Sequence, residues 1–213
     1  MILYFKNGEV VYETDIFGTI LYIVFEGIDL VGKSSQIELL QKEFSDFIFT
    51  KEPGGTAFGV KIREMILHDN LSIDRVSEFF LFLSDRSEHY HKVVKPNLQS
   101  GKTVVSDRSI ISGMAYALQN GGISEENILN INLMTIENRV PDLVIFLEIS
   151  KEELIKRRIT RGHDNIEIRG LEYALQVQEY LEYWTSKLNI RTLKIDASKS
   201  IETIFDEVKK TLI

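Results

Sequence analysis

The sequence predicts an α/β fold in which five strands form a mostly parallel sheet flanked by helices. Short runs of branched and aromatic apolar residues alternate with longer segments of helical periodicity, the pattern of βαβ units. These runs are apolar throughout rather than at every second position, as expected of strands buried on both faces. The predicted strands are Leu21–Phe25, Phe47–Thr50, Thr103–Ser106, Leu143–Ile149 and Thr192–Ile195.

Helices are predicted between the strands, where apolar residues recur at helical spacing. Ser72 and Ser124 stand in positions suited to helix N-caps. The predicted helices are Gly32–Phe44, Phe58–His68, Ile73–Gln99, Ile110–Gln119, Glu125–Glu137, Lys151–Arg161, Leu171–Leu188 and a last one from Ile201.

Residues 1–20 precede this scheme and predict a β-hairpin. Asn7-Gly8 lies between two β-rich runs within Leu3–Tyr12, and this dipeptide favours the tight turn of a hairpin. A disordered leader or an artificial addition are the alternatives, because an isolated two-stranded hairpin is only marginally stable. We therefore expect an N-terminal extension, residues 1–20, and one main domain, residues 21–213.

The composition is that of a globular protein and excludes several classes. Of 213 residues, 44% are hydrophobic, which is ample for a buried core. A net charge of -7 argues against a protein that grips a nucleic acid polymer. The chain has no Cys, no long apolar run that could span a membrane, and no basic segment followed by an apolar export signal. A cytoplasmic enzyme or binding protein is expected.

The segment after the first strand matches the phosphate-binding pattern G-x-x-x-x-G-K-[ST] and opens a helix. Backbone N–H groups of such a loop surround phosphate oxygens, Lys33 reaches the β- and γ-phosphates, and Ser34 can bind Mg²⁺. The guanine-reading Asn-Lys-x-Asp is absent, which favours a small phosphoryl-transfer enzyme over a GTPase switch. The expected ATP-binding residues of this loop are Gly27, Ile28, Asp29, Leu30, Val31, Gly32, Lys33, Ser34 and Ser35.

Two further motifs follow strands and should face the same crevice, since ligands bind at the carboxyl ends of parallel strands. Glu52-Pro53-Gly54-Gly55-Thr56 follows the second strand; the alternative is a plain turn before a helix capped by Thr56. Asp107-Arg108 ends the third strand, which would put a carboxylate beside Mg²⁺ and a guanidinium beside a phosphate. The alternative there is a surface ion pair.

Phe82 and Arg86 lie four residues apart in the long predicted helix and so share one of its faces. A ring and a hydrogen-bonding fork on one face could bind a planar base. The alternative is a Phe-rich stripe that belongs to the core.

In combination these motifs resemble those of thymidylate kinases, which phosphorylate dTMP to dTDP. The resemblance runs from Leu21 to the C-terminus, and the motifs that carry it are Phe25-Glu26-Gly27-Ile28-Asp29, Glu52-Pro53-Gly54-Gly55-Thr56, the Phe82/Asp85-Arg86 helix, Asp107-Arg108 with Ser112 and Tyr116, Asp164-Asn165-Ile166-Glu167 and Asp196-Ala197-Ser198. It implies a P-loop kinase three-layer sandwich with a parallel sheet of strand order 2-3-1-4-5, Mg²⁺ with ATP, dTMP as acceptor and a homodimer.

The resemblance also implies individual roles. Phe82 would stack on thymine and Arg86 would donate to its O4 atom. Arg108 would hold the acceptor phosphate, and Tyr116 would favour deoxyribose by crowding the 2′ position. The implied substrate-binding residues are Asp29, Phe82, Arg86, Arg108, Ser112, Gly113, Tyr116 and Asp164; Ser34, Asp107 and Glu52 would serve the metal, and Asp196, Ala197 and Ser198 would surround adenine.

A basic segment at the end of a predicted helix predicts a lid over residues 156–167. Arg157 and Arg161 share a helix face, and Gly162 offers a hinge. The alternative is a solvated basic helix end. Lid arginines would neutralise the charge of the transferred phosphoryl group, because Leu30 and Val31 carry none. The expected catalytic residues are Lys33, Glu52, Arg108, Arg157 and Arg161, whereas His89, His91 and His163 are expected to be ordinary packing or surface residues.

The sequence departs from the family pattern at three positions. Leu30 stands where many bacterial members have Gly, and Lys51 where Arg is common. Gly113 replaces a polar side chain that some members place on the base, which leaves thymine N3 without a predicted partner. The alternatives to a thymidylate kinase are a kinase for another nucleoside monophosphate or deoxynucleoside and an ATP-sensing protein without catalysis.

Overall fold

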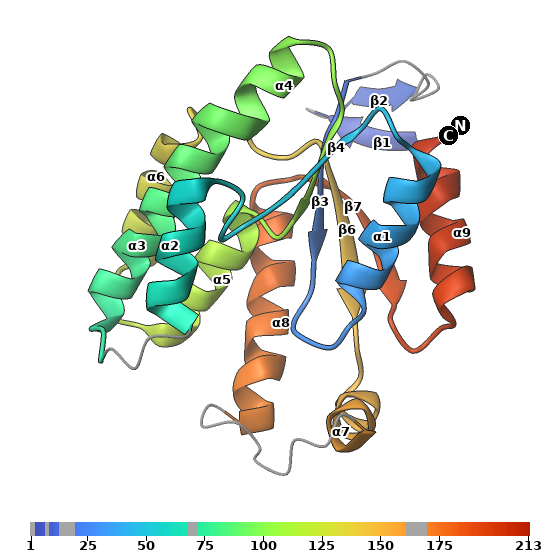
Figure 1. Cartoon of the computed structure of the whole chain (residues 1–213). Helices are drawn as coiled ribbons and strands as arrows, with labels where there is room; N and C mark the ends of the chain where they lie inside the picture. Colours follow the sequence, from blue (N-terminus) through green and yellow to red (C-terminus); the bar gives the residue numbers. More distant parts are fainter. Residues whose placement is uncertain (1–2, 7–8, 13–19, 68–71, 161–169) are drawn as a thin grey trace.

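The computed structural model describes residues 3–6, 9–12, 20–67, 72–160 and 170–213. Figure 1 shows a three-layer arrangement with the sheet between two layers of helices. Within the described ranges, no helix is long and apolar enough to cross a membrane. The strands are β1 (Leu3–Lys6), β2 (Glu9–Tyr12), β3 (Tyr22–Glu26), β4 (Ile48–Lys51), β5 (Val104–Asp107), β6 (Leu143–Glu148) and β7 (Arg191–Asp196).

The central sheet has the order β4-β5-β3-β6-β7, and each neighbouring pair is parallel. This confirms the predicted five-stranded parallel sheet and its order 2-3-1-4-5. All five residues of β3 are buried, which explains why this run is apolar almost throughout. In the register, Phe25 of β3 lies opposite Asp107 of β5, so the loops that follow these two strands start side by side.

The helices divide between the two faces of the sheet. α1 packs against α9 in one layer, and α5 packs against α8 in the other, where α3 and α6 also contact α5 (Figure 1). The helices are α1 (Lys33–Glu43), α2 (Ala57–Leu67), α3 (Arg75–His89), the π turn η1 (Tyr90–Val94), α4 (Lys95–Gln99), α5 (Ile110–Asn120), α6 (Glu125–Thr135), α7 (Lys151–Thr160), α8 (Gly170–Lys187) and α9 (Ile201–Leu212).

The predicted single helix Ile73–Gln99 is interrupted. η1 separates α3 from α4, and Pro96 lies in the first turn of α4. Proline donates no backbone hydrogen bond, and in a continuous α-helix its ring clashes with the carbonyl four residues earlier. The wider π turn before Pro96 avoids that clash.

Of the two predicted caps, one is confirmed and one is wrong. Ser124 caps α6 by accepting from the N–H of Asn127 at 3.3 Å. Ser72 does not cap α3, because Asp74 accepts from Val76 N–H at 2.9 Å. Asp and Ser are about equally good caps, so the position of the first helical turn decided between them.

β1 and β2 pair antiparallel with Lys6 opposite Glu9, which confirms the predicted hairpin. They form a two-stranded sheet separate from the central one. The Asn7-Gly8 turn lies outside the described residues.

Candidate functional site

The phosphate loop joins β3 to α1 and presents free backbone donors. Gly32 precedes α1 with a φ of 97°, and the helix has neither a side-chain cap nor an acidic residue in its first turn. Its first N–H groups are therefore available to an anion, which the helix dipole also favours. Gly27 has a φ of 146°, and a Cβ there would lie 2.6 Å from the carbonyl oxygen of Leu147. Only glycine fits at the start of the loop.

Leu30 stands at the departure noted in the sequence and has a φ of 72°. A leucine in this left-handed region costs about 1–2 kcal/mol. Its side chain is half-buried and packs against the core, which offsets part of that cost. The loop thus keeps its turn without the glycine common in the family.

Lys33 lies under the loop with its side chain buried. Its Nζ atom donates to the carbonyl oxygens of Gly27 and Ile28, both at 2.9 Å. Burial, and next the positive charge of Arg108, lowers the pKa of Lys33 to about 8. A bound polyphosphate favours the charged amine, so ligand binding should raise this pKa again.

We expect ATP binding to take up protons at pH 8 and not at pH 6.5. Near pH 8 about half of the Lys33 side chains are neutral in the free protein, and the bound phosphates would restore their charge. At pH 6.5 the amine is already charged. Calorimetry in two buffers of different ionisation enthalpy measures the uptake, with Lys33→Met as the control. Equal uptake by the control would assign the proton to another group.

A cavity of about 610 Å³ opens beside the loop. Its floor includes Lys33 and Ser34, and Asp107 enters from the end of β5. Oδ1 of Asp107 is buried and has no hydrogen-bond partner within the described part of the chain. A carboxylate oxygen without a partner, next to a hydroxyl and a phosphate loop, fits Mg²⁺, which proteins commonly bind through one or two oxygen ligands and substrate phosphates.

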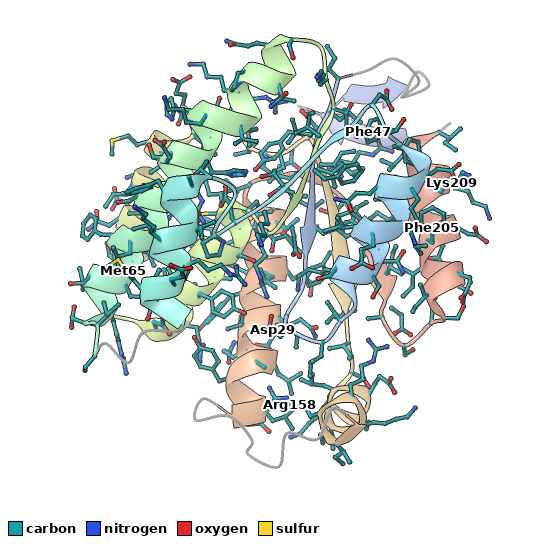
Figure 2. The ribbon with its side chains drawn as sticks, in the orientation of Figure 1. Asp29, Phe47, Met65, Arg158, Phe205 and Lys209 are labelled. Carbon is teal, nitrogen blue, oxygen red and sulfur yellow. The ribbon has the colours of Figure 1, made fainter. Side chains whose placement is uncertain are left out.

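Arg157 of α7 lines this cavity and contacts two loops. Its Nε atom donates to Glu153 at 3.0 Å and Nη1 to the carbonyl of Leu30 at 2.9 Å, while Nη2 donates to the carbonyl of Ala197. Ala197 belongs to the predicted adenine segment, in which Ser198 N–H donates to Asp196 at 2.8 Å. The structure therefore brings the phosphate loop, α7 and the segment 196–198 together at one end of the sheet, where Figure 2 shows both Asp29 and Arg158.

Two predicted lid residues cannot be placed. Arg161 and Asp164 lie outside the described residues, which end in this region at Thr160 and resume at Gly170.

A second cavity of about 310 Å³ lies between α3 and α5. Phe82 and Arg86 of α3 face it, as do Ser112, Gly113 and Tyr116 of α5. An aromatic wall with a few polar groups is the usual construction of a site for a small organic ligand. The structure thus brings together the side chains that the sequence assigned to one acceptor.

Arg108 lies where the two cavities meet, because it lines both. Its Nη1 atom donates to Gly27 carbonyl at 3.2 Å and to Ser112 Oγ at 3.1 Å, and Nη2 donates to Asp29 at 2.6 Å. The guanidinium also lies 5.6 Å from the ring centre of Tyr116. The predicted pairing of a phosphate loop with Asp107-Arg108 therefore exists in space.

Arg63 of α2 is a third side chain shared by both cavities, with Asp29 and Arg108. No motif in the sequence singled out this arginine. Its Nη1 atom donates to the carbonyl of Pro53 at 3.0 Å, which holds the side chain against the Gly-rich loop. A cation in the helix after that loop was the available signal, but helical spacing alone does not show which way it points.

Glu52 contacts two buried side chains. One oxygen accepts from Nε of Arg86 at 3.0 Å and the other contacts Nδ1 of His89 at 2.8 Å, and all three side chains are buried. Burial alone would raise the pKa of Glu52, but Arg86 and His89 hold it below its usual value. Glu52 lines the smaller cavity and not the one with Asp107, and its expected metal and catalytic role stays a prediction. In the structure it pairs with Arg86.

His89 was expected to be an ordinary packing residue, but it has a defined polar environment. Its second ring nitrogen lies 2.7 Å from Oγ1 of Thr50. A Cβ on Gly55 would approach the imidazole to 2.5 Å, so the glycine of the loop makes room for this ring.

Glu26 is a second residue that the motif contained but to which no role was given. Its fully buried carboxylate accepts from Oγ of Ser109 at 2.7 Å and from Oγ of Ser112 at 2.5 Å. Burial raises the pKa of Glu26. Because Ser112 also accepts from Arg108, Glu26 anchors the N-terminal turn of α5 and, through it, the arginine between the cavities.

Comparisons with known proteins agree on one family. The family model described as thymidylate kinase matches residues 25–208. The thymidylate kinase of Campylobacter concisus is 49% identical over 89% of this chain and 97% of its own length, and that of Sulfurimonas denitrificans is 46% identical over 88% and 97%. Among solved structures, thymidylate kinase from Ehrlichia chaffeensis has a TM-score of 0.72 at 27% identity and covers 91% of this chain and 98% of its own.

Proposed function

The chain belongs to the thymidylate kinase family, and on this premise we propose that its two cavities hold the two substrates with their phosphates meeting at Arg108. The enzyme is a phosphotransferase that converts dTMP to dTDP with ATP as donor. The observation that carries the assignment of the cavities is that Arg108, Arg63 and Asp29 line both of them.

The reaction follows from this arrangement. An oxygen of the acceptor phosphate attacks the γ-phosphorus of ATP, the bond from that phosphorus to the β-γ bridging oxygen breaks, and ADP leaves with the bond's electron pair. Arg108 and Arg63 hold the acceptor phosphate, and Lys33 with the N–H groups of α1 holds the donor phosphates. No covalent enzyme intermediate is needed, because positioning and charge stabilisation supply the catalysis.

Mg²⁺ accompanies ATP in this proposal, with Ser34 and Asp107 as the residues that serve it. When bound, the ion neutralises charge on the donor phosphates. Glu52, for which the sequence also predicts a part at the metal, has protein partners at both oxygens and lines the acceptor cavity.

The donor base lies beside the segment Asp196, Ala197 and Ser198, next to Arg157. This placement rests on the contacts of Arg157 with the phosphate loop and with Ala197. Arg161 and Asp164 of the lid remain sequence predictions: Arg161 for neutralising charge on the transferred group and Asp164 for contact near the sugar. Residues 1–20 are an appendage to the kinase unit 21–213, and the location is cytoplasmic.

The acceptor base lies against Phe82, with Arg86 at its O4 atom and Tyr116 near the sugar. Arg86 can only donate hydrogen bonds, which suits the O4 of thymine and opposes the amino group of cytosine. Asp29 is held by Arg108 at the junction, where the 3′-hydroxyl of the sugar would lie.

We expect kcat/KM for dCMP to be at least about a hundredfold below that for dTMP, because a buried donor that faces another donor loses a hydrogen bond and gains a desolvation cost. dUMP lacks only a methyl group and should fall between them. Arg86→Ala should lower the ratio of kcat/KM for dTMP to kcat/KM for dCMP. Arg75→Ala, which changes another residue that lines the same cavity, should leave this ratio unchanged. A coupled assay of ADP release measures each ratio, and a wild-type preference for dCMP or a purine monophosphate would contradict the assignment.

The expected homodimer would use the outer face of α2 and α3. These adjacent helices expose four large apolar side chains, Phe58 and Met65 of α2 and Val76 and Phe80 of α3. Figure 2 shows Met65 at the outer edge of the molecule. Large apolar side chains gathered on a surface are typical of an interface.

Light scattering after gel filtration should give twice the 24.5 kDa of one chain. Phe80→Glu should give the mass of a single chain, because the charge would have to be buried. Ile201→Glu on α9 is the matched control, since its side chain is 50% exposed against 52% for Phe80. A single-chain mass for the wild type would contradict the dimer.

A further inference from the structure

Asn132 is a fully buried polar side chain of α6 that lines neither cavity, yet it reaches the candidate base-binding arginine. Its Oδ1 atom accepts from Nη1 of Arg86 at 2.6 Å, and its Nδ2 atom donates to the carbonyl of Ile128 at 2.7 Å. The second bond sets the orientation of the amide, because only the nitrogen can donate to a carbonyl. The oxygen must therefore face Arg86.

Arg86 is held by three elements of the fold. Glu52 accepts from Nε at 3.0 Å, Asn132 from Nη1 and the carbonyl of Ser109 from Nη2 at 3.3 Å. A guanidinium has five N–H groups. Among the described residues, protein acceptors take three of them, which leaves two for a ligand in the cavity that Arg86 lines.

Glu52 by itself does not determine where these two groups point. It binds Nε, near the pivot of the side chain, so the guanidinium could still swing about that contact. Asn132 binds Nη1 at the opposite end and, with the longer contact of Nη2 to the carbonyl of Ser109, removes this freedom. A guanidinium held at both ends is preorganised for a planar acceptor, because it loses little rotational freedom when the ligand binds.

Gly113 supplies the space in which the guanidinium lies. A Cβ at this position would come within 2.3 Å of Nη2 and 2.7 Å of Nη1 of Arg86. Gly113 does not have a positive φ, so its backbone would accept other residues and the need for glycine is steric. The position that departs from the family pattern is therefore filled by Arg86 itself.

We propose that Asn132 is a positioning residue for base selection, which fixes the guanidinium of Arg86 in the space left by Gly113. The inference rests on the proposed contact of Arg86 with the base. It assigns to α6, which lies behind the site, a part in the discrimination between O4-bearing and amino-bearing pyrimidines.

The test is Asn132→Leu, which keeps a similar volume and removes the acceptor. We expect KM for dTMP to rise about tenfold and the dTMP/dCMP ratio of kcat/KM to fall about tenfold, as for loss of one hydrogen bond to a charged group. kcat and KM for ATP should stay within about twofold, since the donor site is untouched. Asn132→Asp keeps an oxygen for Nη1 and should retain most of the selectivity.

Thr135→Val is the matched control on the same helix. Thr135 is buried and donates to the carbonyl of Asn132 at 2.7 Å, without contact to Arg86 in the hydrogen bonds described. It should lower the thermal midpoint about as much as Asn132→Leu does and leave KM for dTMP and the ratio unchanged. If the effect came from a general loosening of α6, both variants would change KM for dTMP and the dTMP/dCMP ratio alike. That result would overturn the proposal.

Two further outcomes separate this inference from the function it rests on. If Arg86→Ala changes the ratio but Asn132→Leu does not, Asn132 only packs α6 and the inference is wrong. If Arg86→Ala leaves the ratio unchanged, the proposed contact of Arg86 with the base fails first. Should Asn132→Leu not fold, Gly113→Ala decides, because it displaces the same guanidinium, and a wild-type KM and ratio in that variant would overturn the proposal.

Discussion

Lys33→Ala is expected to lower kcat about a thousandfold, or about 4 kcal/mol of transition-state stabilisation. Lys33 is the cation of the phosphate loop, and the charge that develops on the transferred phosphoryl group is greatest in the transition state. KM for ATP should change much less, because the N–H groups at the start of α1 still bind the phosphates. Steady-state kinetics with dTMP at saturation measures both constants.

The loss should not reflect unfolding. The lowered pKa of Lys33 means that burying its charge costs stability; this cost is present in full below about pH 8 and disappears as the pH rises toward 10.5. At pH 7 the alanine variant should therefore unfold at or above the wild-type thermal midpoint. Lys42→Ala, an exposed lysine of the same helix, is the control for kcat. A variant at position 33 with near-normal kcat would contradict the assignment of the loop.

Arg108→Ala is expected to lower kcat/KM for dTMP about a thousandfold, since a charge-assisted fork onto phosphate contributes on the order of 4 kcal/mol. Arg108 touches both cavities, so both the binding of the acceptor and its approach to the donor should suffer. Arg108→Lys restores the charge without the fork and should recover about tenfold. Kd for ATP in the absence of acceptor should remain near the wild-type value, as a nucleotide-binding titration would show.

Arg139→Ala provides the matched loss of an arginine. Arg139 pairs with Asp142 at 2.6 Å, is half-buried and lines neither cavity. A comparable drop in kcat/KM in this variant would mean that a missing ion pair, rather than a missing phosphate ligand, explains the effect at position 108.

The architecture and the phosphate loop were readable from the sequence because their signals are local. A run such as Leu21–Phe25 is apolar at consecutive positions only if both of its faces are covered, which in turn requires helices on both sides of a parallel sheet. The loop motif is contiguous in the sequence. The spacing of Gly27 and Lys33 therefore already sets the backbone turn and the distance over which the lysine reaches the phosphates. The wall that Phe82 and Arg86 share in the smaller cavity was also readable, because the two residues are one helical turn apart.

The break at Pro96 and the cap at Asp74 show where local signals become ambiguous. Helical periodicity continues through Pro96, and two residues near the start of α3 were equally suitable caps. Before Pro96 the clash of the proline ring decides the conformation, and at the start of α3 the position of the first helical turn decides which residue caps it.

What the sequence by itself determined about this protein is therefore its class, with five strands in a parallel sheet, its phosphate loop and the motifs that carry the family resemblance, which in turn implied the strand order and the predicted acceptor residues. Only the tertiary structure decided their partners: Glu52 pairs with Arg86 across 34 residues, Arg86 with Asn132 across 46, and Glu26 with Ser109 across 83. These contacts depend on which helix faces meet. Hydrophobic periodicity shows that a helix face is buried, but it does not show which element that face packs against. A buried charge must find a partner where packing places it, so the roles of Glu52, Arg63 and Asn132 could be recognised only after the helices had been placed together.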